Sequence, residues 1–192
     1  MNRLDLVVGP NGAGKSTFVE LTLAPLLPAS AVVNADEIAK HRWPTDPGSH
    51  AYEAARVAAD TRIRLIELRR AFIAETVFSH PSKLDLIDTA HAADYTVVLH
   101  ALLIPEELAV QRVTHRVNAG GHDVPEDKIR QRYQRLWALV VTAITRCDSS
   151  TVYDNSTLKG PRIVAQMSGG HLIGAPTWPA WTPHMLSSHR PA

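Results

Sequence analysis

The chain has 192 residues, enough for one domain, or for one domain with a small appendage, that buries a core of its own. Its 20 basic and 19 acidic residues give a formal net charge of +1, so no strong field marks DNA, RNA or a membrane surface as the partner. The single cysteine, Cys147, excludes an internal disulfide, and no apolar run reaches the roughly 20 residues of a membrane span, so we expect a soluble cytoplasmic protein.

The first elements of the chain flank a glycine-rich loop. RLDLVV at residues 3–8 predicts a strand, and STFVELTLAPLL at residues 16–27 predicts a helix. Between them the sequence fits Gly-x-x-x-x-Gly-Lys-Ser/Thr, the phosphate-binding loop, and its flanks disfavour the alternative of a plain glycine-rich turn. The residues expected to bind the nucleotide are Gly9, Pro10, Asn11, Gly12, Ala13, Gly14, Lys15, Ser16 and Thr17.

Each part of this loop has an expected task. Backbone N–H groups and the positive end of the helix dipole would hold the phosphates. Lys15 would reach the β- and γ-phosphates, and the Ser16 hydroxyl would ligate Mg²⁺.

Residues 30–40, SAVVNADEIAK, predict a short buried strand, then Asp36 and the start of a helix. A carboxylate at this point could accept a proton from the nucleophile in phosphoryl transfer. The alternative is that Asp36 is the N-cap of the helix, and the two roles are compatible. A loop at residues 43–50 and an amphipathic helix at residues 51–70 follow.

Residues 71–77, AFIAETV, predict a buried strand that ends at Glu75 and Thr76. These two side chains could hold a substrate hydroxyl or a water bound to magnesium, and the alternative is a solvated strand end. No strand shows the apolar run ending in Asp that is typical of a second magnesium-binding motif. The sequence therefore does not indicate which residues beyond Ser16 surround the metal.

A helix at residues 82–94, a buried strand at 95–104 and a helix at 105–117 come next. Gly120 and Gly121 then break the pattern before a helix at about residues 125–146. A lid of about residues 112–135, hinged at these glycines, could bring arginines over the phosphates, although arginines on an amphipathic helix are usually a solvated face. The arginines on either side of the break are Arg112, Arg116, Arg130, Arg132 and Arg135.

Residues 150–156, STVYDNS, predict the last strand, and the tail at residues 169–192 is expected to be irregular and partly disordered, outside a domain of residues 1–168. Apolar strands alternating with helices indicate an α/β fold of the three-layer P-loop NTPase type, with a mostly parallel central sheet and a helical, arginine-bearing lid. Ligands of such sheets bind beyond the carboxyl ends of the strands. The loop, Asp36 and Glu75 should therefore converge on one cleft.

Five segments in this order, GPNGAGKST, VVNADEIA, IAETVFS, RVNAGGHDVPEDKIRQRYQRL and VYDNS, resemble the zeta-toxin family of P-loop kinases, especially its short single-domain members. The resemblance covers roughly residues 3–156. It implies ATP or GTP with Mg²⁺ and transfer of the γ-phosphoryl group to a hydroxyl of a small molecule. In the best-known members that molecule is a UDP-N-acetyl amino sugar, and for this chain we expect UDP-N-acetylglucosamine.

The resemblance also implies roles for single residues. Lys15 and Ser16 would bind the nucleotide, with Lys15 also catalytic, and Asp36 would be the catalytic base. The remaining residues so implied are the substrate contacts Asn34, Glu75 and Thr76 and the catalytic lid arginines Arg116, Arg132 and Arg135.

The chain departs from the large toxins of the family, which carry longer insertions for the UDP-sugar than this chain has room for. The substrate is therefore left more open than the reaction. A toxin implies an antitoxin, and because the loop begins at Gly9 we expect a separate small helical protein as that partner.

Three alternatives remain open at this point. One is a kinase for another small molecule, such as an antibiotic, a nucleoside or a dinucleotide. Another is a nucleotide-binding module without catalysis. The third is an ATPase of the ABC type, because MSGGH at residues 167–171 is similar to the Leu-Ser-Gly-Gly-Gln signature of that class.

Overall fold

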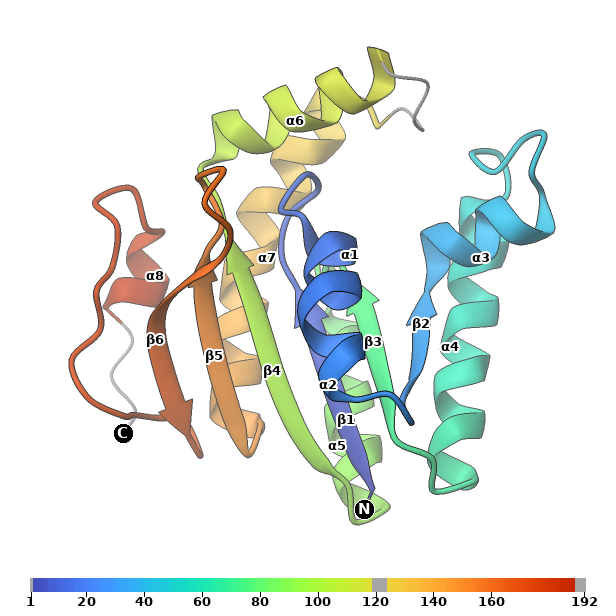
Figure 1. The fold of residues 1–192 in the computed structure, drawn as a ribbon, viewed down its shortest axis with the longest axis horizontal. Coiled ribbons are helices and arrows are strands. Elements are labelled where there is room, and N and C mark those ends of the chain that lie inside the picture. The colour runs from blue at the N-terminus through green and yellow to red at the C-terminus, as the bar shows by residue number, and fades with distance from the viewer. Residues whose placement is uncertain (1, 119–123, 189–192) are drawn as a thin grey trace.

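The computed structural model describes residues 2–118 and 124–188, which form an α/β fold around one sheet (Figure 1). The order of the seven strands in the sheet is β2-β3-β1-β4-β5-β6-β7. This order confirms the expected crossovers, because β1 to β5 are separated by helices in the sequence and are not always neighbours in the sheet. The strands are β1 (Arg3–Val8), β2 (Ala31–Asn34), β3 (Phe72–Thr76), β4 (Thr96–Leu103), β5 (Ser149–Asp154), β6 (Arg162–Ser168) and β7 (His171–Leu172).

The five neighbouring strands from β2 to β5 are parallel, whereas β6 pairs antiparallel with β5 and β7 pairs antiparallel with β6. The central strand β1 is buried along its last five residues, as expected for a strand with helices on both faces. In register, Asn34 of β2 lies beside Glu75 of β3, which lies beside Val7 of β1. The mostly parallel three-layer sheet predicted from the alternation of elements is thus confirmed.

Helices cover both faces of the sheet. In Figure 1, α1 and α2 lie in front of the strands, whereas α5 and α7 pass behind them, and α4 lies by the β2 edge. The helices are α1 (Lys15–Phe18), α2 (Ala24–Leu26), α3 (Ala35–Arg42), α4 (Ala51–Glu67), α5 (Leu84–Ala92), α6 (Glu106–Asn118), α7 (Glu126–Arg146) and α8 (His184–Ser187).

The helix predicted after the loop is continuous but not uniform. A π-helical stretch, Val19–Leu23, joins α1 to α2. Pro25 lies at the start of α2, where its missing N–H removes one bond of the regular ladder, and a wider turn before it accommodates that loss. Phe18 fixes the helix on the sheet by packing its ring against His100 and Tyr153, with centroids 5.9 and 4.9 Å away.

A buried charged cluster lies in the sheet beneath α1. The carboxylate of Asp5 is fully buried on β1, accepts two hydrogen bonds of 2.7 Å from Arg3, and lies 2.9 Å from Nε2 of His100. Burial alone would raise the pKa of Asp5, but the bonds from Arg3 and His100 hold it below its ordinary value. The cluster therefore joins β1 to β4 by charge as well as by the strand ladder.

The prediction that residues 150–156 form the last strand is wrong. β6 pairs antiparallel with β5 through a bulge at Val152/Tyr153, and the two-residue β7 follows it. The sequence signal for β6 is weak because only Val164, Ala165 and Met167 of its seven residues are buried. MSGGH spans the turn from β6 to β7, and no apolar strand ending in acidic residues follows within residues 169–188, which removes the basis of the ABC-type alternative.

The segment at residues 169–188 contains little regular structure beyond β7 and α8. It nevertheless packs on the core through Trp178 and Trp181, and Leu186 of α8 is buried. The backbone N–H of Thr177 donates to the carbonyl of Val164 at 2.7 Å. This segment therefore covers α7 and the end of the sheet beside it.

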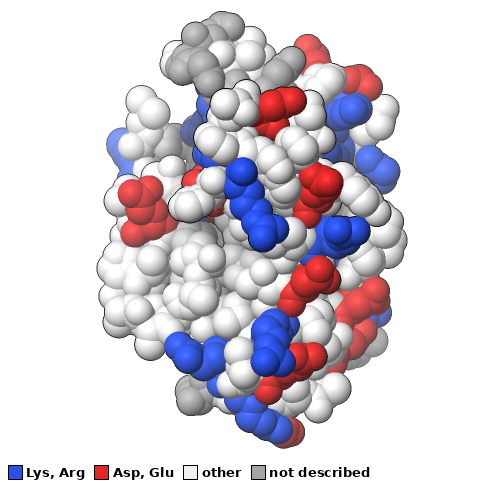
Figure 2. Space-filling model, turned by 90° about the vertical axis from the view of Figure 1, so that its right-hand side faces the viewer, with Lys and Arg blue, Asp and Glu red and all other residues white. Residues whose placement is uncertain are grey.

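Figure 2 shows the side of the molecule where α3 and α4 lie, with basic and acidic side chains interspersed over the surface. This face carries both signs of charge, in keeping with the balanced composition. Within the part of the chain that the structure describes, no helix has both the length and the apolar character needed to cross a membrane.

Candidate active site

The loop between β1 and α1 takes a shape that only glycine allows. Gly12 and Gly14 have φ values of 76° and 80°, in the left-handed region. A Cβ on Gly12 would lie 2.9 Å from the carbonyl oxygen of Ala109, and one on Gly14 would lie 2.7 Å from Nδ2 of Asn155. No side chain caps the first turn of α1, so its N–H groups face the loop and remain for an anion.

Lys15 folds back over this loop. Its Nζ donates to the carbonyl oxygens of Gly9 at 3.1 Å and Pro10 at 3.0 Å, and its side chain is buried. Burial lowers the pKa of Lys15, while the negative charges of Glu75 and Asp36 oppose that shift. Neutral carbonyl oxygens thus hold the ammonium in the loop. A phosphate can take their place as the partner of the ammonium without breaking an ion pair.

The carboxyl ends of β2 and β3 bring two polar side chains, Asn34 and Glu75, to Ser16. The Ser16 hydroxyl donates to Oε1 of Glu75 at 2.9 Å, and Nδ2 of Asn34 donates to Oε2 of Glu75 at 2.7 Å. Burial raises the pKa of Glu75, although the charge of Lys15 opposes this. A hydroxyl and a carboxylate oxygen side by side are the hard oxygen donors that Mg²⁺ prefers, so these residues fit the metal that the phosphate loop implies.

Asp36 is the second residue of α3 and does not cap the helix. The cap is Asn34, whose Oδ1 accepts from the N–H of Asp36 at 2.8 Å, so the alternative of Asp36 as the N-cap is wrong. Asp36 is exposed, and its carboxylate forms no hydrogen bond with any residue in the ranges 2–118 and 124–188. It nevertheless lies close enough to Lys15 and Glu75 to shift the pKa of both.

Asn34 and Thr76, both expected to contact the substrate, have partners inside the protein. The amide of Asn34 is buried and uses its nitrogen on Glu75 and its oxygen on the backbone of Asp36. The hydroxyl of Thr76 accepts from the N–H of Phe78 at 3.3 Å and is only half-buried. Asn34 therefore orients Glu75 through its amide nitrogen and Asp36 through its amide oxygen.

Two residues that sequence reasoning did not assign to the loop hold its backbone. Nδ2 of Asn155, just past β5, donates to the carbonyl of Ala13 at 2.8 Å. Nη1 of Arg112, on α6, donates to the carbonyls of Gly12 at 3.3 Å and Asn155 at 3.0 Å. The sequence signal for Asn155 is its place near the carboxyl end of the strand predicted at residues 150–156, and Arg112 falls among the predicted lid arginines instead.

The lid arginines separate into groups. Arg116 and Arg132 lie close enough to Lys15 for their charges to lower its pKa, which places both beside the phosphate loop. Arg135 is exposed and donates from Nε to the carbonyl of Gln131 in its own helix, at 3.2 Å. The predicted hinge, Gly120 and Gly121, lies outside the described residues.

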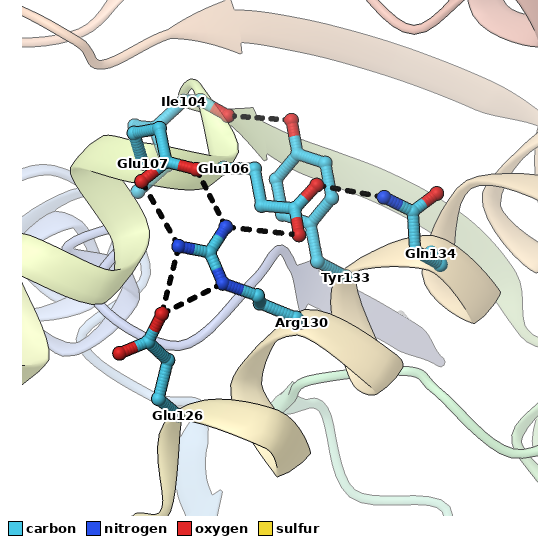
Figure 3. A network of polar contacts seen from close by, with 7 residues as sticks. All are labelled: Ile104, Glu106, Glu107, Glu126, Arg130, Tyr133 and Gln134. Carbon is cyan, nitrogen blue, oxygen red and sulfur yellow. Dashed lines mark hydrogen bonds and ion pairs between the residues drawn. The ribbon is translucent and has the colours of Figure 1, made fainter.

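Arg130 is the centre of a network between α6 and α7 (Figure 3). Its guanidinium donates to Glu107 at 2.6 and 3.0 Å, to Glu126 at 2.9 Å and to Glu106 at 3.4 Å. Gln134 adds a bond of 2.7 Å to Glu106. Arg130 is therefore committed to carboxylates and joins the two helices, rather than facing a phosphate.

Comparisons with known proteins found relatives in sequence and in fold. An uncharacterized protein of Haemophilus influenzae is 29% identical over 133 residues, which are 69% of this chain and 93% of that protein. The native AvrRxo1-ORF1:AvrRxo1-ORF2 complex superposes with a TM-score of 0.70 at 16% identity, covering 90% of this chain and 60% of that one. The PezAT toxin-antitoxin system of Streptococcus pneumoniae superposes with a TM-score of 0.66 at 12% identity, covering 86% and 72%.

At these identities the solved structures show the fold alone, and the chain spans only 60% of the AvrRxo1 chain that it matches. The sequence comparison reaches further, because the model of the family described as Zeta toxin matches residues 2–158. That stretch includes the phosphate loop, Asp36, Glu75, the lid arginines and Asn155. The chain belongs to the zeta toxin family.

Proposed function

We propose that the protein transfers the γ-phosphoryl group of ATP or GTP to a hydroxyl of a small molecule, with UDP-N-acetylglucosamine as the first candidate. The observation that carries this proposal is the geometry at the carboxyl ends of β1, β2 and β3. A phosphate loop held by Asn155 and Arg112 lies there beside Asp36, whose carboxylate forms no hydrogen bond within residues 2–118 and 124–188. A site that only bound nucleotide would have no use for that carboxylate.

The nucleotide would bind along Gly9–Thr17, with its phosphates on the backbone N–H groups of the loop and on Lys15. Ser16 and Glu75 would hold Mg²⁺, directly or through a water. When bound, the ion would supply positive charge that offsets the negative charge developing on the phosphate oxygens. The solved structure of AvrRxo1-ORF1:AvrRxo1-ORF2 with ATP, a protein of the same fold, supports a nucleotide as the ligand.

Asp36 would act on the acceptor. Its carboxylate would take the proton of the acceptor hydroxyl as that oxygen forms a bond to the γ-phosphorus and the bond from the γ-phosphorus to the bridging oxygen breaks. Its exposure and lack of a hydrogen-bond partner within the described ranges leave it available for this. Asn34 would set its position through the cap of α3.

Arg116 and Arg132 would supply positive charge to the phosphoryl group in the transition state, because both already act on Lys15 electrostatically. Arg135 remains a weaker candidate for the same task, since its Nε is bonded within its own helix.

The family and the PezAT toxin-antitoxin structure support a second part of the proposal, that the protein is a toxin with a separate antitoxin. The antitoxin would be a separate small helical protein. A kinase for an antibiotic, a nucleoside or a dinucleotide is the other candidate function, because the fold alone does not fix the acceptor.

The test is a transfer assay with purified protein, Mg²⁺ and ATP radiolabelled in its γ-phosphoryl group, against UDP-sugars, nucleosides and a cell metabolite extract. The Lys15→Ala protein is the blank, because loss of this ammonium should abolish transfer. Label on a UDP-amino sugar would support the proposed acceptor, and label on another molecule would keep the kinase and replace the acceptor. Equal labelling by the Lys15→Ala protein would contradict the assignment of the loop.

A further inference from the structure

A cavity of about 460 Å³ lies between the start of α6, the first half of α7 and the C-terminal segment. Three aromatic residues, Tyr133, Trp137 and Trp181, line it together with Met185 and Glu106. The rings of Tyr133 and Trp137 meet edge to face, with centroids 5.4 Å apart and planes 76° apart, and so form a corner. A cavity of this size with mostly aromatic and apolar walls and few polar groups is typical of a small-molecule site.

The cavity is separate from the nucleotide site. Arg112 and Asn155, which hold the phosphate loop, are not among the residues that line it. The family model ends at residue 158, whereas Trp181 and Met185 lie beyond that point. The C-terminal segment is nevertheless fixed in place, because Leu186 of α8 is buried in the core. Part of the wall therefore comes from outside the stretch that the family model matches.

Glu106 is the carboxylate at this cavity whose charge is least compensated. Arg130 donates to Glu107 at 2.6 and 3.0 Å and to Glu126 at 2.9 Å, but it reaches Glu106 only at 3.4 Å (Figure 3). The other carboxylate oxygen of Glu106 accepts a bond of 2.7 Å from Gln134, whose amide is neutral. Glu106 therefore keeps most of its charge available to a ligand.

The charges around Glu106 add up to a negative excess. Three carboxylates, those of Glu106, Glu107 and Glu126, share the single guanidinium of Arg130. They lie in the first turns of α6 and α7, where each helix dipole adds about half a positive charge. About one negative charge is left over. This charge also acts on the cavity wall, because burial first and then the charge of Glu106 raise the pKa of Tyr133 to about 12.

Aromatic walls and a carboxylate both attract a cation. The face of a Trp or Tyr ring is the negative part of its quadrupole, and a cation held against it gains more when water is excluded. Among the residues that line the cavity there is no lysine or arginine, and His184 is the only base. The cavity thus offers a place for positive charge that its own lining residues do not fill.

We propose that this cavity binds a small organic cation, an ammonium or guanidinium group carried on an apolar body. The charged group would lie beside Glu106 and the apolar body against Trp181 and Met185. The site goes beyond the proposed transfer reaction and does not depend on it, because the binding can be measured without nucleotide or turnover.

The experiment compares three probes of nearly the same shape and different charge. They are choline, which is cationic, 3,3-dimethylbutan-1-ol, which is neutral, and 3,3-dimethylbutanoate, which is anionic. Each is titrated into ¹⁵N-labelled protein at constant ionic strength and about pH 8, where histidine side chains carry little charge. The readout is the indole N–H signals of the four tryptophans, assigned with Trp137→Phe and Trp181→Phe.

We expect choline to shift the signals of Trp137 and Trp181 and to leave that of Trp43 in place, with a Kd on the order of millimolar. The neutral alcohol should bind at least about fivefold more weakly, and the carboxylate more weakly still. Equal affinities for choline and the alcohol, or a shift confined to the Trp43 signal, would overturn the proposal. An absent response to choline would do so as well.

Glu106→Gln tests the charge of the site while keeping the size of the side chain. It should weaken choline binding by about fivefold or more and leave the affinity for the alcohol unchanged. Glu107→Gln is the matched control, because Glu107 also binds Arg130 but does not line the cavity. Equal losses in both variants would assign the effect to the Arg130 network and contradict the proposal. Trp181→Leu, outside that network, should weaken both probes and gives a second test.

A lysine side chain of another protein could present the same ammonium. The amide of Nα-acetyl-lysine tests that source, and binding about tenfold tighter than that of choline would overturn the assignment to a small molecule. Choline binding by a protein that transfers no label would mean that the proposed kinase function failed and the cation site stands. Transfer of label without any choline response would mean the reverse.

Discussion

The nucleotide side and the acceptor side of the site are built in opposite ways. On the nucleotide side Lys15 binds two loop carbonyls and Arg112 binds two more. On the acceptor side, Asp36 has no hydrogen bond to its carboxylate, and Arg62, which donates from α4 to the backbone carbonyl of Glu75, has a buried Nε without a partner, within the described ranges. Lys15 and Arg112 therefore have partners before any ligand binds, whereas the Asp36 carboxylate and Nε of Arg62 have none within the described residues.

This difference follows from what each side must bind. Phosphates in a P-loop are held mainly by backbone N–H groups, so the loop has to be fixed in shape beforehand. The acceptor would be recognised by polar side chains that lack partners in the free protein. Because only a matching acceptor supplies those partners, these side chains would select it over other molecules. Variants on the two sides should therefore fail differently.

The largest effect is expected at Asp36. Asp36→Asn keeps the size of the side chain and removes the proposed base, so turnover should fall by about 10²–10⁴-fold, with nucleotide affinity little changed. Its thermal midpoint should match that of the wild type, because Asn34 and not Asp36 caps α3. An unaltered turnover number would leave Asp36 as a surface charge.

The lid arginines come next. Arg116→Ala and Arg132→Ala should each lower kcat by about 10- to 10³-fold, because both charges already reach Lys15. Arg135→Ala, one turn from Arg132 on α7, should change kcat by less than about threefold. Steady-state rates with one acceptor decide this, and a larger loss for Arg135→Ala would reverse the ranking of the arginines.

Asn155→Ala probes the fixed shape of the nucleotide side. Loss of the bond to Ala13 should lower the free energy of unfolding by about 1 kcal/mol and weaken nucleotide binding by about tenfold. Urea denaturation and calorimetric titration of the nucleotide measure the two effects. Ser156→Ala, at the next position, is the control. Equal effects in the two variants would show that the bond from Asn155 to Ala13 has no specific role in holding the loop.

The smallest effect concerns Glu75 and pH. Because burial raises the pKa of Glu75, the folded state keeps its proton above the pH at which the unfolded chain releases it. The stability linked to this carboxyl is complete below the unfolded pKa and is lost as pH rises through the folded one. In urea denaturation from about pH 5 to about pH 7.5, Glu75→Gln should therefore gain stability relative to the wild type, by less than Asn155→Ala loses. Glu67→Gln, at an exposed position, should show no such trend.

The fold and the phosphate loop could be predicted because their signals are local. Apolar runs mark β1, β3 and β4, and the loop motif occupies eight consecutive positions, Gly9 to Ser16. The partners of the loop could not be found that way, since Asn155 and Arg112 are 142 and 100 positions away from the carbonyls they bind. Contacts of that range depend on the order of strands in the sheet.

Other differences arise where two residues are equally suited to one task. Asn34 and Asp36 are both good N-caps, and only the course of β2 into α3 decides for Asn34. Arg62 reads as part of the polar face of an amphipathic helix, and its burial follows from the position of α4 against β3. The sequence places Arg130 among the arginines of the predicted lid. In the structure its guanidinium instead bonds to carboxylates of α6.

The central place of β1 has a consequence for biosynthesis. β1 is the first strand of the chain, yet its partners β3 and β4 begin at Phe72 and Thr96, and the loop is held by Asn155. A nascent chain therefore keeps its first strand and its loop without partners until most of the domain has left the ribosome. Nucleotide binding becomes a late event in synthesis, so that fragments released early would have no stable phosphate loop and no activity in the cell.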